Sequence, residues 1–454
     1  MRKYFVFLFL IATTSAQAKQ YKPTTDSLPP TIKTGWTFGA LPAITFDSDL
    51  GFQYGGIVNL YYYGDGSTYP TYQHSIYAEV SRFTKGSGIN RLFYDSKYLI
   101  PGIRVTSDAS YLTDQASDFY GWNGQETKYK PNWVDDGDPQ YVSRVFYKYD
   151  RKLARFSTDL QGKLYGDKLY WAVGIALYNF EIGSVDLSKL NRGKSGSDKL
   201  PDVPELYDKY VSWGLINSTE KSGGFHTYIK AGVVFDTRDF EANPSTGIWA
   251  EAIMNVTPPL LGEKNYDHAN LSLVYRQYLP VVKSKITFAY RLATQLNVAG
   301  KIPFYLRPNL TTLYLRRATS EGLGGSQTLR GIMRSRVVGN GIAYGNFELR
   351  WKFLQTVVRH QNLYLSLNLF SDIGQVIQPV RVNQNEVTSL AAALNPTFKA
   401  SDYFTSSDEK LHTTYGAGLR IAINENFIIA ADYGRATSRN DGTSGLYIAL
   451  NFLF

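Results

Sequence analysis

Apolar and polar residues alternate along most of this chain, and that period of two is typical of β-strands. One stretch places Ile286, Phe288, Tyr290 and Leu292 on the same face. Another does the same with Leu363, Leu365, Leu367 and Leu369. In a soluble sandwich the apolar face would point to a core, whereas in a membrane barrel it would face lipid. Alternation alone leaves both folds open.

Composition excludes several other classes of protein. No run of about 18 apolar residues follows the N-terminal segment, which argues against a helical membrane protein. Hydrophobic residues make up 43% of the 454 residues, yet the mean hydropathy is only −0.26. The 35 Tyr and 25 Phe in so polar an average favour an outer-membrane barrel. With no cysteine, disulfide scaffolds and cysteine chemistry are excluded. The net charge of +9 suits contact with lipid headgroups and predicts no nucleic acid.

The N-terminus predicts export from the cytoplasm. Arg2 and Lys3 precede a short apolar stretch, and the residues up to Ala18 form a small-x-small cleavage pattern. We therefore expect residues 1–18 to be a removed signal peptide. Residues 19–33 would then form a short periplasmic segment, too short for a folded domain, before a barrel over residues 34–454.

The connectors between strand-like segments separate the two folds. We count about sixteen segments, which begin near Trp36, Phe52, Tyr72, Ile89, Gly102, Tyr141, Lys168, Gly224, Gly247, His268, Lys285, Gly341, Gln361, Leu411, Asn426 and Ser444. Long connectors are expected at Thr113–Gln140, Ser184–Ser222, Ala299–Asn340 and Val376–Lys410. All four follow odd-numbered segments, so they fall on one side of the sheet. Short turns on one side and long loops on the other predict a single antiparallel transmembrane β-barrel of about sixteen strands.

The end of the chain fits the same fold. Ile448, Leu450, Phe452 and Phe454 are spaced by two, as expected for an apolar stripe that faces lipid and ends in an interfacial ring. These residues also resemble the terminal signal by which outer-membrane proteins are recognised for insertion.

Catalytic motifs are weak. The five histidines lie on separate segments without the spacing of metal ligands: His74, His226, His268, His360 and His412. Gly193-Lys194-Ser195-Gly196 echoes a phosphate-binding loop, but Ser188 stands where its leading Gly belongs. We expect no enzyme, no metal and no cofactor.

One long connector and the strand after it carry the candidate site. Leu329-Arg330-Gly331-Ile332 lies in the longest outer loop, and the next strand contains Asn346, Glu348 and Arg350 in the lumen phase. On the following strand, the parity that sends Leu369 outward sends Asp372 inward. An inward-folded Arg330 could therefore bridge the carboxylates of Glu348 and Asp372 and hold the loop inside the lumen. A solvated Arg330 above a wet pore remains the alternative on spacing alone.

Several motifs resemble the BamA/TamA-type surface-antigen barrel superfamily. Leu329-Arg330-Gly331-Ile332 resembles its V-R-G-[YF] loop motif, with Ile332 in place of the aromatic residue. Gly345-Asn346-x-Glu348-x-Arg350 resembles the strand that follows, and Phe370-Ser371-Asp372-Ile373-Gly374 its F-x-D-x-G segment. Asp236-Thr237-Arg238-Asp239, Pro244 and Gly247 resemble its D-T-R-D…P…G strand-turn-strand motif.

The resemblance implies a sixteen-stranded barrel whose sixth outer loop enters the lumen, with Arg330 in contact with Asp372 and Glu348. It also implies protein insertion into, or translocation across, the outer membrane of a Gram-negative bacterium, through a weak seam between the first and last strands. The expected partners are outer-membrane lipids, lipopolysaccharide and periplasmic or outer-membrane assembly proteins. The family's periplasmic arm of polypeptide-transport-associated domains is not expected here, so a separate periplasmic partner is. A passive pore and a lipid-modifying enzyme are the competing hypotheses.

Overall fold

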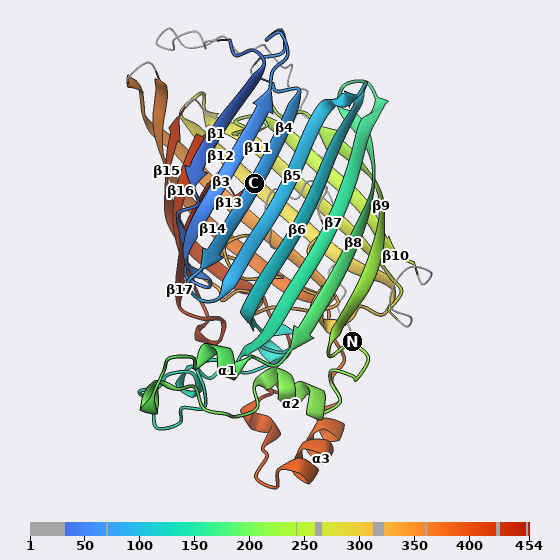
Figure 1. The fold of residues 1–454 in the computed structure, drawn as a ribbon, viewed down its shortest axis with the longest axis vertical. Helices are drawn as coiled ribbons and strands as arrows, with labels where there is room; N and C mark the ends of the chain where they lie inside the picture. The colour runs from blue at the N-terminus through green and yellow to red at the C-terminus, as the bar shows by residue number, and fades with distance from the viewer. Residues whose placement is uncertain are drawn as a thin grey trace.

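The structure is a computed structural model that describes residues 32–69, 71–241, 243–258, 266–311, 322–358, 361–423, 427–450 and 453–454. These residues form one closed antiparallel β-barrel (Figure 1). Its strands are β1 (Trp36–Pro42), β2 (Thr45–Asp47), β3 (Gly51–Tyr62), β4 (His74–Phe83), β5 (Ser87–Ile100), β6 (Ile103–Asp118), β7 (Lys148–Tyr165), β8 (Leu169–Gly183), β9 (Gly223–Asp236), β10 (Gly247–Thr257), β11 (His268–Val282), β12 (Ile286–Gly300), β13 (Gly341–Val358), β14 (Gln361–Gln378), β15 (His412–Ile423), β16 (Phe427–Ala436) and β17 (Ser444–Leu450).

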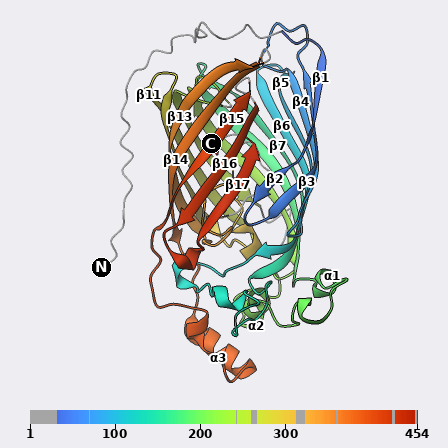
Figure 2. The same ribbon diagram turned by 90° about the vertical axis from the view of Figure 1, so that its left-hand side faces the viewer.

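The seventeen labelled segments make sixteen strands, because β1 and β2 are two parts of one. Both pair with β3 in a single continuous register, which runs from Pro42 opposite Gly56 to Thr45 opposite Gln53. Every other strand pairs with its neighbours along the chain, and β17 closes the ring against β2 (Figure 2). The predicted all-β barrel of about sixteen strands is confirmed.

Alternation decides which side chains face lipid. On β13 the side chain of Leu349 is 39% exposed, whereas its neighbour Glu348 is fully buried in the lumen. Leu369 and Phe370 on β14 show the same contrast. The outer wall is therefore apolar and the lumen polar, the reverse of a soluble sandwich. Within the described residues, no helix is long and apolar enough to cross a membrane.

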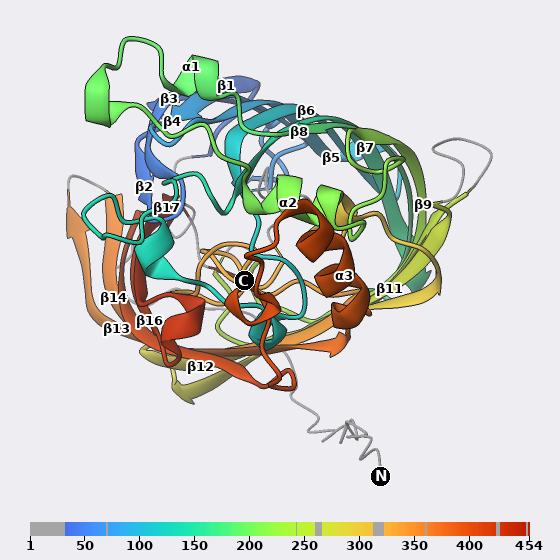
Figure 3. The ribbon, with the colours of Figure 1, turned by 90° about the horizontal axis from the view of Figure 1, so that it is seen from below.

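The long connectors gather at one end of the barrel, at the bottom of Figure 1. They contain α1 (Leu187–Leu190), α2 (Leu206–Ser212) and α3 (Gln384–Leu394). Seen from below, α2 and α3 lie across the mouth of the barrel (Figure 3). An aromatic cluster joins these segments into what we call the outer cap: Phe119, Trp122, Phe146, Tyr147, Tyr207, Tyr210, Trp213, Phe304, Tyr305 and Phe404. Short 3₁₀ helices lie in the connectors at Gly124–Glu126, Pro131–Trp133, Gly196–Asp198, Phe304–Leu306, Ala400–Asp402 and Arg439–Asp441.

Several predicted boundaries were wrong. The strand expected from Tyr141 begins at Lys148, because residues 141–147 contribute Phe146 and Tyr147 to the outer cap. The strand expected to end before Thr113 continues to Asp118. The predicted signal peptide and most of the segment 19–33 lie outside the described residues, so those boundaries remain predictions.

Candidate functional site

The candidate site is built around the lumen loop, which we define as residues 301–340 between β12 and β13. Its tip, residues 323–337, is closed by an isolated bridge between Leu323 and Val337. Within the tip, the Thr328 hydroxyl accepts from the backbone N–H of Gly324 at 2.9 Å. Leu329 and Ile332 are buried with Ile342 and Val376 of the barrel wall. The tip is therefore a compact turn packed against the inside of the barrel.

Arg330 at this tip binds three carboxylates on the barrel wall. Its Nε and Nη2 atoms donate to the two oxygens of Asp372, each at 2.9 Å. Its Nη1 atom donates to Glu348 Oε1 at 2.7 Å and to Asp432 Oδ2 at 3.3 Å. The guanidinium carbon lies 3.5 Å from the centre of the Phe370 ring. Arg330 is only 1% exposed, so the alternative of a solvated loop residue does not describe this structure.

The charges around Arg330 offset the cost of burying it. Burial by itself lowers the pKa of the Arg330 guanidinium, but Asp372 and Glu348 raise it well above its ordinary value. The acceptors on β13, β14 and β16 surround one planar cation, and two of the bonds form a bidentate pair. Arginine suits this arrangement better than lysine. We call Arg330 with Asp372, Glu348 and Asp432 the latch.

Glycine allows the loop tip to approach the wall this closely. Gly331 has a φ of +99°, and a Cβ atom there would lie 2.5 Å from the backbone carbon of Gly434 on β16. A Cβ at Gly434 would in turn lie 2.3 Å from the carbonyl oxygen of Arg330. Both positions exclude a side chain, so the Arg-Gly pair of the motif has a steric basis.

Two further side chains hold the backbone of the tip. Asn346 on β13 donates to the carbonyl oxygen of Thr328 at 2.6 Å and to Asp372 Oδ1 at 2.8 Å. Arg291 on β12 donates to the carbonyl oxygen of Gln327 at 2.7 Å. The loop is thus bound through its main chain as well as through Arg330.

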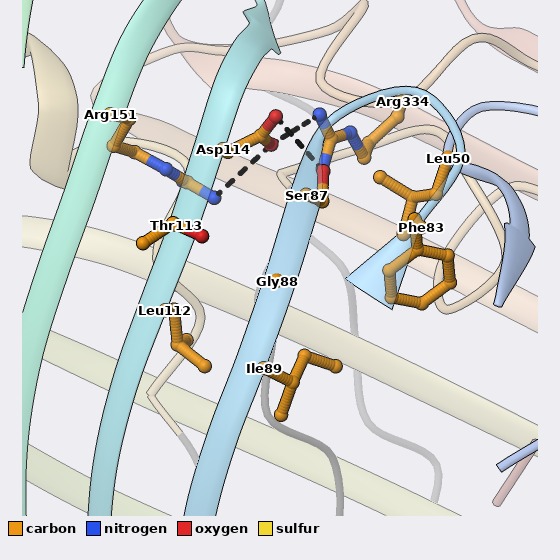
Figure 4. Close-up of a pocket in the computed structure, with 10 residues that line it drawn as sticks. All are labelled: Leu50, Phe83, Ser87, Gly88, Ile89, Leu112, Thr113, Asp114, Arg151 and Arg334. Carbon is orange, nitrogen blue, oxygen red and sulfur yellow. Dashed lines mark hydrogen bonds and ion pairs between the residues drawn. The ribbon is translucent and has the colours of Figure 1, made fainter. Parts of the chain in front are cut away.

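Arg334 anchors the tip to the opposite wall. It donates to Asp114 at 2.7 Å and to Asp118 at 2.8 Å, both at the outer end of β6. Figure 4 shows Arg334 and Arg151 approaching Asp114 from two sides, in a small cavity that Leu50 and Phe83 also line. Arg334 was not among the residues predicted from the sequence. Its spacing of four from Arg330 is a signal only once the loop is known to cross the lumen.

The strand-turn-strand motif forms a separate structure at the short-turn end. Arg238 makes a bidentate pair with Asp236, at 2.9 and 3.0 Å, and stacks on Trp249. Asp239 accepts from the backbone N–H groups of Ser245 and Thr246 and so closes the turn.

Two other residues of the motif shape this turn. Pro244 lies within it, and Gly247 begins β10 with a φ of +102° where a Cβ would lie 2.3 Å from Thr237 O. The turn reaches across to β14, where Asn243 donates to the Tyr364 hydroxyl at 2.7 Å. The motif therefore forms a structural turn at the short-turn end of the barrel, and these hydrogen bonds do not join it to the latch.

The seam between β17 and β2 is the weakest junction of the barrel. Within the described residues its ladder has two residue pairs, Tyr447 with Asp47 and Ile448 with Phe46, and next to them the N–H of Ser48 donates to the carbonyl oxygen of Leu446 at 3.1 Å. Among the described residues, β1 pairs only with β3, so its other edge meets no strand. The N–H of Ala43 bonds to Gly55 of β3, so the neighbouring Pro42 faces the open edge, where proline has no N–H to donate.

The tip of the lumen loop contacts this seam directly. The backbone N–H of Gly331 donates to the Tyr447 hydroxyl at 3.1 Å. Tyr447 pairs with Asp47 across the seam. The loop tip and the first-to-last strand junction are therefore neighbours in the fold.

The end of the chain differs from the expected lipid-facing stripe. Ile448 and Leu450 are partly buried on the outer face, and Phe452 lies outside the described residues. Phe454 is only 5% exposed and packs in the lumen against Tyr278 and Ala289. The expectation of an interfacial ring at Phe454 was wrong, because cationic side chains in the lumen attract the ring inward: Arg291 and Arg350 lie 5.2 and 5.1 Å from its centre.

The structure also assembles contacts that sequence spacing could not reveal. Asp432 on β16 joins the latch and pairs with Arg420. His412 lies between Glu409 and Asp441, at 3.1 and 2.8 Å, and links the outer connectors to one another. These partners are far apart in sequence or fall in loops, where periodicity gives no register.

A closed sixteen-stranded antiparallel barrel with an apolar outer wall, short turns at one end and a loop held in the lumen defines an outer-membrane protein of a Gram-negative bacterium. The profile of the Omp85 superfamily domain matches residues 72–454. The chain belongs to the Omp85 superfamily. No curated protein matches it in sequence.

Solved structures share the fold at low sequence identity. BamA from Haemophilus ducreyi lacking POTRA domains 1–3 has a TM-score of 0.52 and 13% identity, covering 92% of this chain and 70% of that one. CdiB from Escherichia coli has a TM-score of 0.54 and 12% identity, covering 94% of this chain and 64% of that one. This chain thus spans less than two thirds of that CdiB.

Proposed function

We propose that this barrel inserts proteins into, or translocates polypeptides across, the outer membrane by opening the β17–β2 seam, and that it works with a separate periplasmic partner. The observation that carries the proposal is the seam itself: two residue pairs, next to an unpaired β1 edge and in contact with a latched lumen loop. The family and the likeness to BamA and CdiB are consistent with this role.

The chemistry of an open strand edge explains how such a seam would act. In hydrocarbon, each unpaired backbone N–H or C=O group costs roughly several kcal/mol. A strand edge exposed to lipid is therefore stabilised when another strand pairs with it. An incoming client strand can supply that partner by adding to the edge of β1. Pro42 would keep the edge from pairing along its whole length, so that the added strand can later leave.

The proposal includes a partner because the short-turn end offers little surface of its own. The described turns there are brief, such as residues 101–102, 166–168 and 283–285. They leave little room to hold an unfolded client.

A passive pore is the second hypothesis, and the filling of the lumen counts against it. The loop tip crosses from the β13–β14 wall to β6 through Arg330 and Arg334, and the outer cap covers one mouth. A barrel filled in this way should show low, flickering conductance in a planar bilayer. A large steady ohmic conductance would favour the pore.

A deletion strain tests the main proposal. We expect loss of the gene to change the inventory of outer-membrane barrels or secreted proteins, and the intact protein to restore it. The oxidised Phe46→Cys/Ile448→Cys variant, whose seam is cross-linked, should fail to restore it until reduced. An unchanged envelope inventory in the deletion strain would reject the function, and full activity of the oxidised variant would reject the seam as its route. Co-purification from the intact membrane would identify the partner.

A further inference from the structure

We propose that Arg350 is a positioning residue that transmits the state of the Arg330 latch to the end of the last strand, and thereby determines how far β17 pairs along the first strand. Its consequence for client insertion rests on the proposed function. The mechanical link itself depends only on contacts within this chain.

Arg350 makes two kinds of contact at once. On β13 its Nε and Nη2 atoms bond to Glu348 Oε2, each at 2.8 Å. Its Nη2 atom also donates to the main-chain oxygen of Phe454 at 3.1 Å, while the guanidinium lies over the Phe454 ring. Arg350 is 3% exposed, so these charge-assisted bonds form away from bulk water.

Glu348 carries the link onward to the loop. One carboxylate oxygen, Oε2, binds Arg350, and the other, Oε1, binds Arg330. The two cations therefore share one fully buried carboxylate. Loss of Arg330 would leave Glu348 free to reorient toward Arg350 alone, which would change where Arg350 holds Phe454.

A second contact joins the loop to the same strand. Gly331 donates to the Tyr447 hydroxyl, seven residues before Phe454 in the chain. The loop tip thus meets β17 at the seam and again, through Glu348 and Arg350, beyond the last described strand residue. Both contacts are broken together if the loop moves away from the wall.

The position of the chain end controls the length of the seam. The pairs Tyr447–Asp47 and Ile448–Phe46 define a register that would place Leu450 opposite Ile44 if pairing continued. Leu450 forms no pair with β1 or β2 in the described residues, and Phe454 instead lies in the lumen beside Tyr278. Releasing Phe454 would let β17 pair further along the first strand, beginning with Leu450 opposite Ile44.

Cysteine cross-linking of the purified, refolded barrel tests this without any client. The chain has no cysteine of its own, so a Leu450→Cys/Ile44→Cys pair reports extension of the seam specifically. In this background we expect Arg350→Ala to raise the rate of disulfide formation by roughly fivefold or more. A single lost polar contact shifts the equilibrium between the short and the extended seam by about that factor, and the rate follows the population of the extended seam. Phe454→Ala should do the same by removing the ring. Arg350→Lys should give an intermediate rate, because it keeps the charge and loses the planar fork.

Matched controls separate the relay from a general loss of packing. Arg155→Ala removes another buried lumen arginine. Arg155 on β7 binds Asp108 on β6, away from the seam, so this variant should leave the cross-linking rate unchanged. A Phe46→Cys/Ile448→Cys pair should cross-link readily in every variant, since those residues are already paired.

The latch mutant decides whether Arg350 transmits anything. Arg330→Ala should raise the Leu450–Ile44 rate when Arg350 is present, and add little in an Arg350→Ala background. Equal rates in the parent and Arg350→Ala barrels would overturn the proposal. So would fully additive effects of Arg330→Ala and Arg350→Ala. Either result would leave the insertion function to be judged by the deletion strain, whereas a failed deletion test would not affect the cross-linking result.

Discussion

Two junctions of the same barrel differ greatly in strength. The β13–β14 junction comprises seventeen residue pairs, and its inner face carries Glu348 and Asp372 of the latch. The β17–β2 junction comprises two pairs, and the rest of the first strand has an unpaired edge among the described residues. Both are built from the same kind of backbone ladder, so strand pairing alone does not explain the contrast.

The difference shows where the fold concentrates its polar contacts. The three ion pairs of Arg330 lie on the wall formed by β13, β14 and β16, and those of Arg334 lie on β6. Among the described contacts, the seam strands meet that loop through hydrogen bonds, at Tyr447 and Asp47. A barrel organised in this way can separate at one junction while the others hold. The weak junction is thus a local property of β1, β2 and β17, where the chain end turns inward and Pro42 interrupts the donors.

Cross-linking each junction should give the largest contrast in stability. The Phe46→Cys/Ile448→Cys disulfide closes almost the whole chain into one loop, for which chain entropy predicts about 6 kcal/mol, against about 3 kcal/mol for Leu349→Cys/Leu369→Cys across β13–β14. Urea unfolding, followed by the mobility of unheated protein on gels, measures both. Equal gains from the two disulfides would contradict this expected contrast.

Breaking the latch should be the next largest effect. Arg330→Ala leaves Asp372 and Glu348 buried without their shared cation, and loss of one partner of a buried pair costs about 3–5 kcal/mol. We expect faster proteolysis within the lumen loop and altered heat-modifiable migration. Adding Asp372→Ala should cost less than the sum of the single changes. The exposed Arg439→Ala variant serves as the control, and unchanged protease sensitivity in Arg330→Ala would contradict the latch.

The smallest effect should appear in the outer cap, away from both junctions. Burial, together with the nearby Asp208 carboxylate, raises the pKa of Glu205 to about 8. Because the pKa of Glu205 is raised in the folded state, its protonated side chain stabilises the folded state relative to the ionised one. This contribution to the free energy of unfolding is complete below about pH 4.5 and is lost as the pH rises through about 8. Proteolysis of residues 184–222 should therefore accelerate as the pH rises from about 4.5 to about 8, the interval between the ordinary and the raised pKa of Glu205. Glu205→Gln should flatten this dependence and Asp198→Asn should not; a pH-independent rate in the parent would reject it.

Much of the wall and part of the site could be predicted from the sequence. Parity along β13 and β14 placed Glu348 and Asp372 inward, because a side-chain period of two admits only two faces. The same rule placed Leu349 and Leu369 in lipid. Parity could not predict Asp432, since its relation to Arg330 depends on how far the loop reaches around the ring.

The ends of strands were the least predictable part. Phe454 continues the alternation of Ile448 and Leu450, and periodicity therefore assigned it to lipid. Two lumen arginines and Tyr278 hold it inside instead. The outer cap was equally invisible, because its aromatic contacts join four connectors that have no common register.

By itself, the sequence determined a closed barrel, its two faces and the loop that carries Arg330, because backbone groups in lipid must pair and side chains on a strand must alternate. Only the tertiary structure decided that three carboxylates converge on Arg330, that Arg350 reaches the end of the chain, and that the ring closes over two residue pairs. Those features depend on distances between strands that are remote in sequence, and local patterning carries no information about such distances.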